Sequence, residues 1–274
     1  MKGFIWVQRG KAMLADTPPE RVVINTNTMR ILILGGTSEA SQLAAQLSRN
    51  ARLKVITSLA GRTEAPAPTA GFVRSGGFGG ARGLQGFMED NAIDVLVDAT
   101  HVFATQMTRN AIVAARAARR PYYRLCRSAW TPRDGDRWID ADDTAHAAEQ
   151  LTAGAVAFLT IGRQHLAPFA ARRDVVMIAR MIEAPTEFLP DHLTIIRGRP
   201  PFSLPAEREI LRRYCISVIV TKNSGGSAVA AKLTAAREMA IPVIMIRRPQ
   251  GQPPADASTA EDMAALIERH LTGQ

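Results

Sequence analysis

Residues 29–43 constrain the fold of this chain most tightly, because an apolar segment there runs directly into a small-residue turn and then into a helix. The segment Ile-Leu-Ile-Leu is typical of a strand buried on both faces of a parallel sheet. Gly35 and Gly36 follow, and their backbone can approach a ligand closely. Thr37 and Ser38 then begin a helix whose first amides favour an anion such as a phosphate. The spacing lacks the full G-x-G-x-x-G pattern, so this stretch alone leaves nucleotide binding and a plain turn equally open.

A second apolar segment, residues 53–58, predicts the next parallel strand. The residues at its end lie where a dinucleotide-binding sheet meets the adenosine ribose. An acidic residue there favours NAD, whereas a serine and an arginine suit the 2′-phosphate of NADP. This chain has Ser58 and Arg62, which favours NADPH over NADH. An arginine that merely extends from a surface loop is the alternative.

Residues 93–98 predict another buried strand, which ends in the sequence Asp-Ala-Thr-His. Polar residues at the carboxyl end of a parallel strand line the ligand crevice of open α/β sheets, so Asp98, Thr100 and His101 are candidate site residues. His101 is the candidate proton donor because imidazole titrates near neutral pH, and we expect His101→Ala to weaken turnover. A histidine that only hydrogen-bonds the loop or the cofactor is the alternative.

Residues 71–83 contain six glycines, which is too many for a regular element. The composition predicts a loop that wraps closely around a flat ligand, with Arg74 and Arg82 as anion contacts. A flexible connector is the alternative.

Neither the strand nor the helix pattern of apolar residues continues through residues 130–138, and a second series of alternating strands and helices follows. One of its predicted strands ends beside Arg163. Another runs into Lys222-Asn-Ser-Gly-Gly, which repeats the plan of the opening stretch. Lys222 and Ser224 are therefore candidates for holding a phosphate or a carboxylate, although the Walker A spacing is absent.

This alternation predicts an α/β protein of two Rossmann-like or flavodoxin-like three-layer domains, each with a mainly parallel sheet, and an interdomain cleft. We place the domains at residues 29–130 and 131–274, and a hydrophobic content of 46% is sufficient for their cores. Residues 1–28 show no periodicity and are interpreted as a disordered leader or as the product of an upstream start codon. No apolar run is long enough for a membrane span or a signal-peptide core, which favours the cytoplasm.

The chain carries a formal charge of +9, which favours anionic partners. An arginine-rich coding bias with a solvated surface explains the charge equally well. No run of five or six like charges marks a nucleic-acid tail, and we expect no nucleic-acid partner. Cys126 and Cys215 have no second cysteine or histidine at metal-ligand spacing, so we expect neither a metal site nor a disulfide framework.

Together, these loops resemble those of the precorrin-6A reductases of cobalamin biosynthesis. The matching motifs are Gly35-Gly-Thr-Ser-Glu-Ala40, Ser58-Leu-Ala-Gly-Arg62, Gly76-Gly-Phe-Gly-Gly80, Asp98-Ala-Thr-His-Val-Phe-Ala104, Lys222-Asn-Ser-Gly-Gly226 and Arg248-Pro249. The resemblance covers essentially all of residues 29–270. Val102 stands where the family usually has proline, and Pro200-Pro201-Phe202 stands where it usually has Gly-Pro-Phe. Both departures fall in loops and affect the expected backbone shape there more than the assignment.

The resemblance implies hydride transfer from a reduced nicotinamide cofactor to a carbon-carbon double bond of precorrin-6A, giving precorrin-6B. Its implied partners are NADPH, with NADH less favoured, and the tetrapyrrole substrate, with no membrane and with transient contacts to other corrin-pathway enzymes. The implied cofactor site comprises Gly35, Gly36, Thr37, Ser38, Ser58, Arg62 and Thr100. The substrate carries acetate and propionate groups, which suit cationic contacts. The implied substrate site comprises Arg74, Arg82, Arg163, Lys222, Ser224 and Gly225.

Two other functions fit part of the pattern. An S-adenosylmethionine-dependent methyltransferase also uses a glycine-rich loop after its first strand, but it predicts an acidic residue where this chain has Ser58. A nucleotide-sensing or nucleic-acid-binding protein without enzymatic activity suits the charge, but the sequence contains no recognisable nucleic-acid module.

Overall fold

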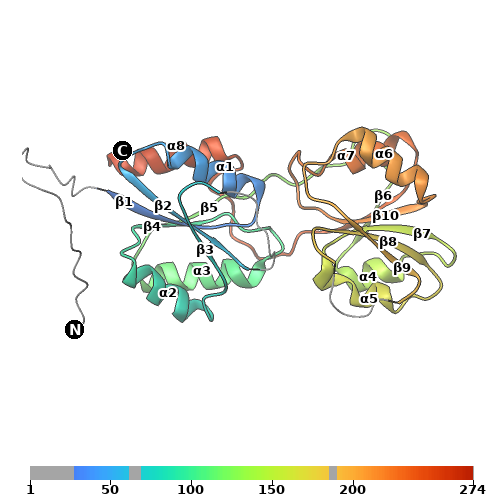
Figure 1. Cartoon of the computed structure of the whole chain (residues 1–274), viewed down its shortest axis with the longest axis horizontal. Coiled ribbons are helices and arrows are strands. Elements are labelled where there is room, and N and C mark those ends of the chain that lie inside the picture. Colours follow the sequence, from blue (N-terminus) through green and yellow to red (C-terminus); the bar gives the residue numbers. More distant parts are fainter. Residues whose placement is uncertain (1–27, 62–68, 185–189, 274) are drawn as a thin grey trace, which may run out of the picture.

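The computed structural model describes residues 28–61, 69–184 and 190–273, and it contains two parallel β-sheets, each between two layers of helices (Figure 1). The strands of the first sheet are β1 (Met29–Leu34), β2 (Leu53–Leu59), β3 (Phe72–Ser75), β4 (Val95–Asp98) and β5 (Tyr122–Arg124). Their spatial order is β3-β2-β1-β4-β5. The order reverses between β1 and β4, and ligands bind at such a switch point in open α/β sheets.

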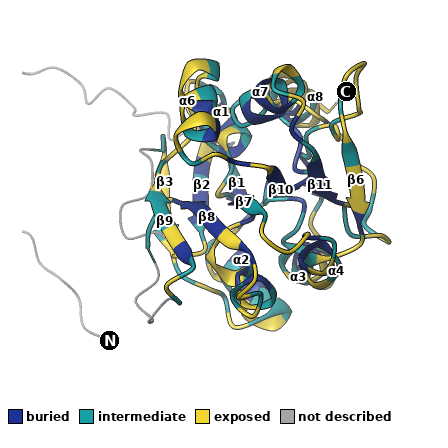
Figure 2. Cartoon of the chain, turned by 90° about the vertical axis from the view of Figure 1, so that its right-hand side faces the viewer, coloured by how far each residue is buried: buried dark blue, intermediate teal, exposed yellow. Residues whose placement is uncertain are grey.

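Within the described residues, the first sheet is covered by helices α1 (Ser38–Leu47), α2 (Ala81–Asp90), α3 (Thr105–Ala117) and α8 (Ala260–Thr272). The central strand β1 explains the unbroken apolar run of the sequence. Ile31 and Ile33 pack beneath α1 and α8, whereas Leu32 and Leu34 pack against α2 and α3. Alternate side chains point to opposite faces of a strand, so burial of both faces requires apolar residues at every position. Figure 2 shows the buried strands between the helical layers.

The second sheet has the strand order β6-β11-β10-β7-β8-β9, and all its pairs are parallel. Its strands are β6 (Trp138–Ala141), β7 (Val156–Thr160), β8 (Val176–Met181), β9 (Leu193–Arg197), β10 (Val218–Lys222) and β11 (Val243–Ile246). One face packs on α4 (Thr144–Glu149) and α5 (Ala167–Ala170), and the other packs on α6 (Leu204–Arg213) and α7 (Ala231–Glu238). The predicted α/β class with two parallel three-layer units is therefore confirmed.

The last helix, α8, packs on the first sheet, whereas the sequence-based division at residue 130 assigned it to the second domain. Met263 and Ile267 are fully buried in the cluster that contains Leu43 and Leu47 of α1. The segment before α8 runs beside the linker that leaves the first sheet after β5. Ala257 of the former and Leu125 of the latter form a parallel bridge. The amphipathic pattern of α8 shows that it covers an apolar surface, but it carries no information about which sheet provides that surface.

Two elements lie where the sequence predicted none. The glycine-rich residues 71–83 form β3 and the beginning of α2, and β3 is an edge strand with Phe72 71% exposed. Many of the glycines stand at the ends of these elements, where Gly76 and Gly80 have φ of 110° and 102°. Strand β6 begins within the predicted boundary segment. The prediction of an unstructured leader falls on residues 1–27, which lie outside the described residues.

In residues 28–61, 69–184 and 190–273, no helix combines the length and the apolar character that crossing a membrane requires.

Candidate functional site

A cavity of about 670 Å³ lies between the two sheets, at the carboxyl ends of strands from both. Loops after β1 and β4 line it from the first sheet, and loops after β7, β8 and β10 line it from the second. This is the predicted interdomain cleft. It brings together seven of the predicted site residues, namely Gly36, Thr37, Ser38, His101, Arg163, Lys222 and Ser224.

The two glycines after β1 have different roles. A Cβ on Gly35 would lie 2.9 Å from Thr57 Cγ2, and the Gly35 amide donates to Ser58 O at 2.9 Å, so this residue packs β1 against β2. Gly36 has a φ of +108°, and no atom lies within 4 Å of the Cβ position there. The backbone at Gly36 is thus open toward the cavity, as the approach of a pyrophosphate requires.

Thr37 caps helix α1 and closes the turn. Its Oγ1 accepts from the Ala40 amide at 3.1 Å and donates to Ala99 O at 2.8 Å, which joins the loops after β1 and β4. Ser38 is the first helical residue and is exposed. The helix therefore presents the start of its amide array to the cavity, and this geometry suits an anion.

Arg74 lies beside Ser58 and not with the cationic residues of the cavity. In the parallel register of β2 and β3 these two residues are direct neighbours. Arg74 Nη1 donates to Ser58 Oγ at 2.7 Å and to Gly76 O at 2.9 Å, and its guanidinium lies 4.0 Å from the centre of the Phe78 ring. Arg74 was predicted as a substrate contact, but the structure places it at the carboxyl ends of β2 and β3 and not among the residues that line the cavity. Arg62 lies outside the described residues.

Asp98 and Thr100 stabilise the loop after β4 and do not line the cavity. Asp98 Oδ1 accepts from the amide and the hydroxyl of Thr100 at 3.1 and 2.6 Å, and Oδ2 accepts from Thr108 at 2.7 Å and from Tyr122 at 3.2 Å. Burial and this carboxylate raise the pKa of Tyr122. The strand-end rule places Asp98 near a ligand crevice, but its side chain turns inward to satisfy its hydrogen bonds.

His101 lines the cavity as a neutral imidazole. Burial, followed by the nearby charges of Arg127, Lys222, Arg248 and His165, lowers its pKa from 6.5 to about 3. Nδ1 accepts from the Phe103 amide at 3.3 Å, so we assign the proton of the neutral ring to Nε2. In this arrangement His101 can donate a hydrogen bond to a ligand. It holds no imidazolium proton for transfer at neutral pH, which argues against the donor role expected from the sequence.

The wall formed by the second sheet contains two buried cations that the sequence did not single out. Arg180, at the end of β8, is 8% exposed and donates through Nη1 to Glu207 Oε1 at 2.7 Å. Lys232, in the first turn of α7, is 2% exposed. Lys222 lies with them, with Nζ 5.0 Å from the centre of the Phe103 ring. Arg180 could have been predicted, because polar residues at the carboxyl ends of parallel strands line ligand sites in this class of fold. Nothing in the sequence pattern of the helix distinguished Lys232.

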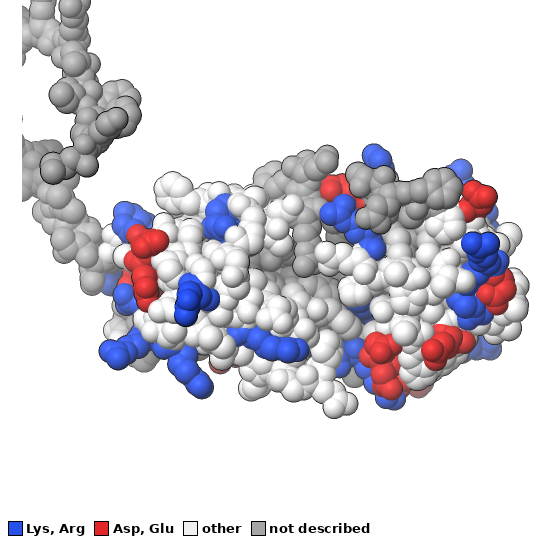
Figure 3. All heavy atoms as spheres, turned by 90° about the horizontal axis from the view of Figure 1, so that it is seen from below, with Lys and Arg blue, Asp and Glu red and all other residues white. Residues whose placement is uncertain are grey.

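Of the remaining predicted arginines, Arg163 belongs to the cavity and Arg82 does not. Arg163 lines the cavity from the segment after β7. Arg82 is exposed on α2, away from the lining residues. On the face shown in Figure 3, Lys and Arg side chains are dispersed over both units with acidic residues among them. The cationic character of the cavity thus depends on a few buried side chains and not on a basic surface stripe.

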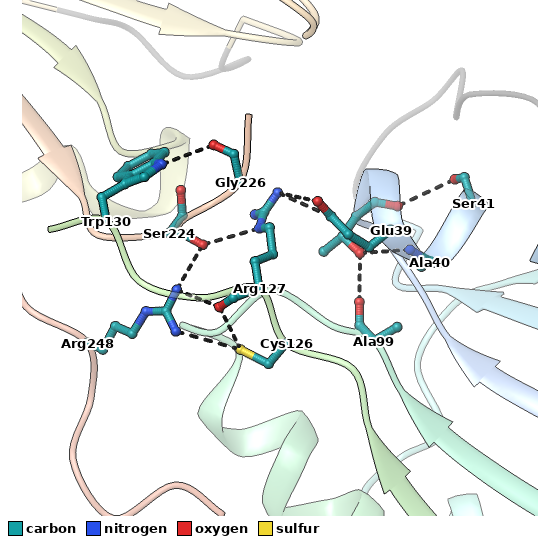
Figure 4. Close-up of polar contacts among 11 residues, drawn as sticks. Glu39, Ala40, Ser41, Ala99, Cys126, Arg127, Trp130, Ser224, Gly226 and Arg248 are labelled. Atoms are coloured by element: carbon teal, nitrogen blue, oxygen red, sulfur yellow. Dashed lines mark hydrogen bonds and ion pairs between the residues drawn. The ribbon is translucent and has the colours of Figure 1, made fainter. Parts of the chain in front are cut away.

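Gly225 packs beneath the linker and does not contact the cavity, which corrects its prediction as a substrate residue. Its φ is +71°, and a Cβ there would overlap Ser128 O. Gly226 is similarly enclosed, with its Cβ position 2.6 Å from Arg127 Cδ. Trp130 Nε1 donates to Gly226 O at 3.0 Å and holds the loop against the linker (Figure 4). The small residues here allow two backbone segments to approach each other and do not cradle an anion.

Two arginines complete this junction, which Figure 4 shows. Arg127 Nη1 lies 3.2 Å from Glu39 Oε2, and Arg127 Nε donates to Ser224 O at 3.2 Å. Arg248 donates to Arg127 O and to Asn223 O, both at 2.9 Å. The linker, the start of α1 and the loop after β10 are thereby joined at one edge of the cavity.

Comparisons with known proteins agree with this geometry. Residues 30–269 match a family model described as precorrin-6x reductase CbiJ/CobK. A precorrin-6A reductase of Rhodococcus erythropolis is 47% identical over 239 residues, which are 87% of this chain and 96% of that protein. A precorrin-6A reductase of Rhodobacter capsulatus is 39% identical, over 87% of this chain and 93% of that protein.

A solved structure of CobK precorrin-6A reductase matches this fold with a TM-score of 0.83 at 37% identity, covering 89% of this chain and 97% of that one. The match extends over both sheets, and the family model spans the cavity residues of each. This chain therefore belongs to the precorrin-6A reductase family.

Proposed function

We propose that this chain reduces a carbon-carbon double bond of precorrin-6A in cobalamin biosynthesis, with NADPH as the hydride source. The observation that carries the proposal is the cavity in which the open turn after β1 faces the buried cations of the second sheet. One wall suits a dinucleotide and the other suits the carboxylates of a tetrapyrrole, so the two reactants meet between them.

The first sheet fits a dinucleotide on two grounds. Gly36 leaves open space in front of the N-terminus of α1, where a pyrophosphate accepts hydrogen bonds from backbone amides. Ser58 and Arg74 lie at the ends of the adjacent strands, which is the position of the adenosine ribose in this fold class. The bound nicotinamide would supply hydride, and the protein contributes orientation and exclusion of water.

The preference for NADPH rests on Arg74. Ser58 Oγ and the carbonyl of Gly76 fix its guanidinium, and the Phe78 ring supports one face. A guanidinium fixed in this way is preorganised for the bidentate geometry of a phosphate monoester. An acidic residue that would bind the ribose hydroxyls of NADH or S-adenosylmethionine does not occupy the end of β2, where Ser58 stands.

The substrate would bind against the second sheet. Lys222, Arg163 and Arg180 line that wall, and each can pair with an acetate or propionate group. We further propose the cobalt-free substrate, because the relatives at 39–47% identity are named precorrin-6A reductase, whereas those named cobalt-precorrin-6A reductase are 28–29% identical. His101, held neutral beside the nicotinamide end of the site, would orient a ligand through Nε2–H.

The test is a coupled measurement of cofactor and tetrapyrrole. Purified chain is mixed with NADPH and authentic precorrin-6A, and the loss of nicotinamide absorbance is followed together with the mass of the tetrapyrrole. We expect oxidation of NADPH only when precorrin-6A is present, with a mass gain of two hydrogens in the product. Parallel reactions with NADH, with cobalt-precorrin-6A and with S-adenosylmethionine test the competing assignments. No oxidation with authentic substrate, or transfer of a methyl group, would contradict the proposal.

A further inference from the structure

Lys232 is buried in the wall of the cavity without a full counter-charge. It is 2% exposed, yet it is among the cavity-lining residues. Its Nζ donates to Val229 O at 2.7 Å and lies 4.8 Å from the centre of the Trp130 ring. No carboxylate in the described part of the chain forms an ion pair with it. The ammonium is thus held in place by a neutral carbonyl and an aromatic face.

The surroundings of Lys232 disfavour its charge. It stands in the first turn of α7, where the positive end of the helix dipole repels a cation. Burial lowers its pKa most, Arg180 from β8 and Arg127 from the linker lower it further, and Glu207 from α6 opposes them, for a result of about 7. Glu207 itself pairs with Arg180, and its Oε2 lacks a hydrogen-bond partner among the described residues. A lysine in such a place destabilises the fold compared with an apolar residue, and this is typical of functional groups.

The proposed reaction requires a proton as well as a hydride. When hydride adds to one carbon of the double bond, the π electron pair moves to the neighbouring carbon, and that carbon forms its C–H bond with a proton. An N–H bond of an ammonium breaks in that step and leaves a neutral amine, which regains a proton from water. His101 is neutral in this cavity, and the guanidinium groups hold their protons too tightly to donate them.

We propose that Lys232 is the general acid that delivers this proton to the substrate. The inference rests on the proposed function, and it names the residue that supplies the proton of the reduction. A group donates most effectively when its pKa lies near the working pH, and the surroundings of Lys232 bring it to that range. Lys232 lines the cavity, and Val229 O and the Trp130 ring hold its Nζ in one position, as directed protonation requires.

The test compares Lys232→Met with Lys232→Arg. The first removes the charge and the proton, whereas the second keeps a cation that does not release its proton. Both should lower kcat by about 100-fold or more, the usual contribution of a positioned acid, while the KM for NADPH stays at the wild-type value. The wild-type kcat should fall as the pH rises and Lys232 loses its proton, and this limb should be absent from both variants. Lys54→Met is the matched control, because Lys54 is exposed on β2 away from the cavity, and it should behave as wild type.

Two further measurements exclude a purely structural effect. Added ethylamine should restore part of the turnover of Lys232→Ala, and the restored rate should depend on the pKa of the added amine. The chain has five lysines, so ¹³Cε-labelled lysine gives few NMR resonances. In the unliganded protein one of them should titrate near the pKa of about 7 and disappear in Lys232→Met.

The outcomes separate the two proposals. A wild-type chain that does not oxidise NADPH with precorrin-6A would overturn the proposed function. An active wild type combined with a Lys232→Arg variant that keeps its kcat and its pH limb would overturn the role of Lys232 alone. If Lys232→Met does not fold, as judged by circular dichroism, Lys232→Arg and amine rescue of Lys232→Ala decide the question, and absence of rescue in a folded Lys232→Ala protein counts against the proposal.

Discussion

Arg127 Nη1 lies 3.2 Å from Glu39 Oε2, and this ion pair joins the linker between the sheets to the first turn of α1. The side chains are only 14% and 17% exposed. Through Nε the same guanidinium donates to Ser224 O, in the loop after β10. One side chain thus connects the proposed cofactor wall of the cavity to the proposed substrate wall.

Removing this connection should destabilise the protein. Arg127→Met leaves the Glu39 carboxylate mostly buried without its cation and removes the donor to Ser224 O, and we expect a loss of about 2–3 kcal/mol in the free energy of unfolding. Urea denaturation at neutral pH measures it. The control is Arg120→Met, which breaks a pair with Asp94 whose side chains are 43% and 38% exposed, and it should change stability by less than about 1 kcal/mol. Equal losses in the two variants would contradict the structural importance of the Arg127 pair.

The loop after β10 should tolerate no side chain where it meets the linker. Gly225 and Gly251 both have a φ of +71°, so alanine at either position adopts the same unfavourable backbone conformation. Only at Gly225 would the Cβ also overlap Ser128 O, whereas no atom lies within 4 Å of it at Gly251. We expect Gly225→Ala to be less stable than Gly251→Ala by about 1–3 kcal/mol in urea denaturation, the usual effect of overpacking. Identical stabilities would show that the linker moves away without penalty.

The sequence predicted the features of this fold that depend on local pattern. Residues 31–34 are apolar at every position because β1 is covered on both faces, and this requirement is visible in one short segment. The glycine turn after β1 was likewise predicted from a short segment, because close backbone approach calls for glycine, and the structure adds that Gly36 has a φ of +108°. Such signals do not depend on distant parts of the chain.

The remaining errors concern partners that are distant in sequence. Arg74 was predicted as an anion contact because its glycine-rich segment suggested a loop wrapped around the ligand, and only the pairing of β3 with β2 places it opposite Ser58. Gly225 resembled a phosphate loop, but its enclosure by Ser128 comes from a linker nearly a hundred residues earlier in the chain. The burial of Lys232 likewise depends on how α7 meets the linker. Registers and packing partners of this kind are determined by the tertiary structure and leave no periodic trace in the sequence.

The position of Arg74 predicts how the cofactor is selected. Arg74→Gln should raise the KM for NADPH by about tenfold or more, the effect of losing a charge-assisted hydrogen bond to a phosphate, and should leave the KM for NADH unchanged. Initial rates at varied cofactor concentration with saturating precorrin-6A measure both constants. Arg82→Gln is the control, because Arg82 is exposed on α2 and should affect neither constant. Equal increases for the two cofactors would show that Arg74 does not contact the 2′-phosphate. The same assay tests Arg62, which the sequence also assigns to the 2′-phosphate: Arg62→Ala should raise the KM for NADPH much more than the KM for NADH.

The neutral state of His101 predicts a specific acid sensitivity. Its pKa is lowered from 6.5 to about 3 in the folded protein, so the unfolded chain binds one proton more than the folded chain between these values. Stability from this source is complete above pH 6.5 and is lost as the pH falls toward 3. His101→Gln removes the titrating group, and its stability relative to wild type should rise by about 2–3 kcal/mol between pH 7.5 and pH 4.5. Urea denaturation of both proteins at the two pH values measures this difference. The two proteins share the same carboxylates, so the contributions of these groups to the pH dependence cancel. A difference that does not change with pH would show that His101 takes up its proton at the same pH in the folded protein as in the unfolded chain, and would restore it as a candidate proton donor.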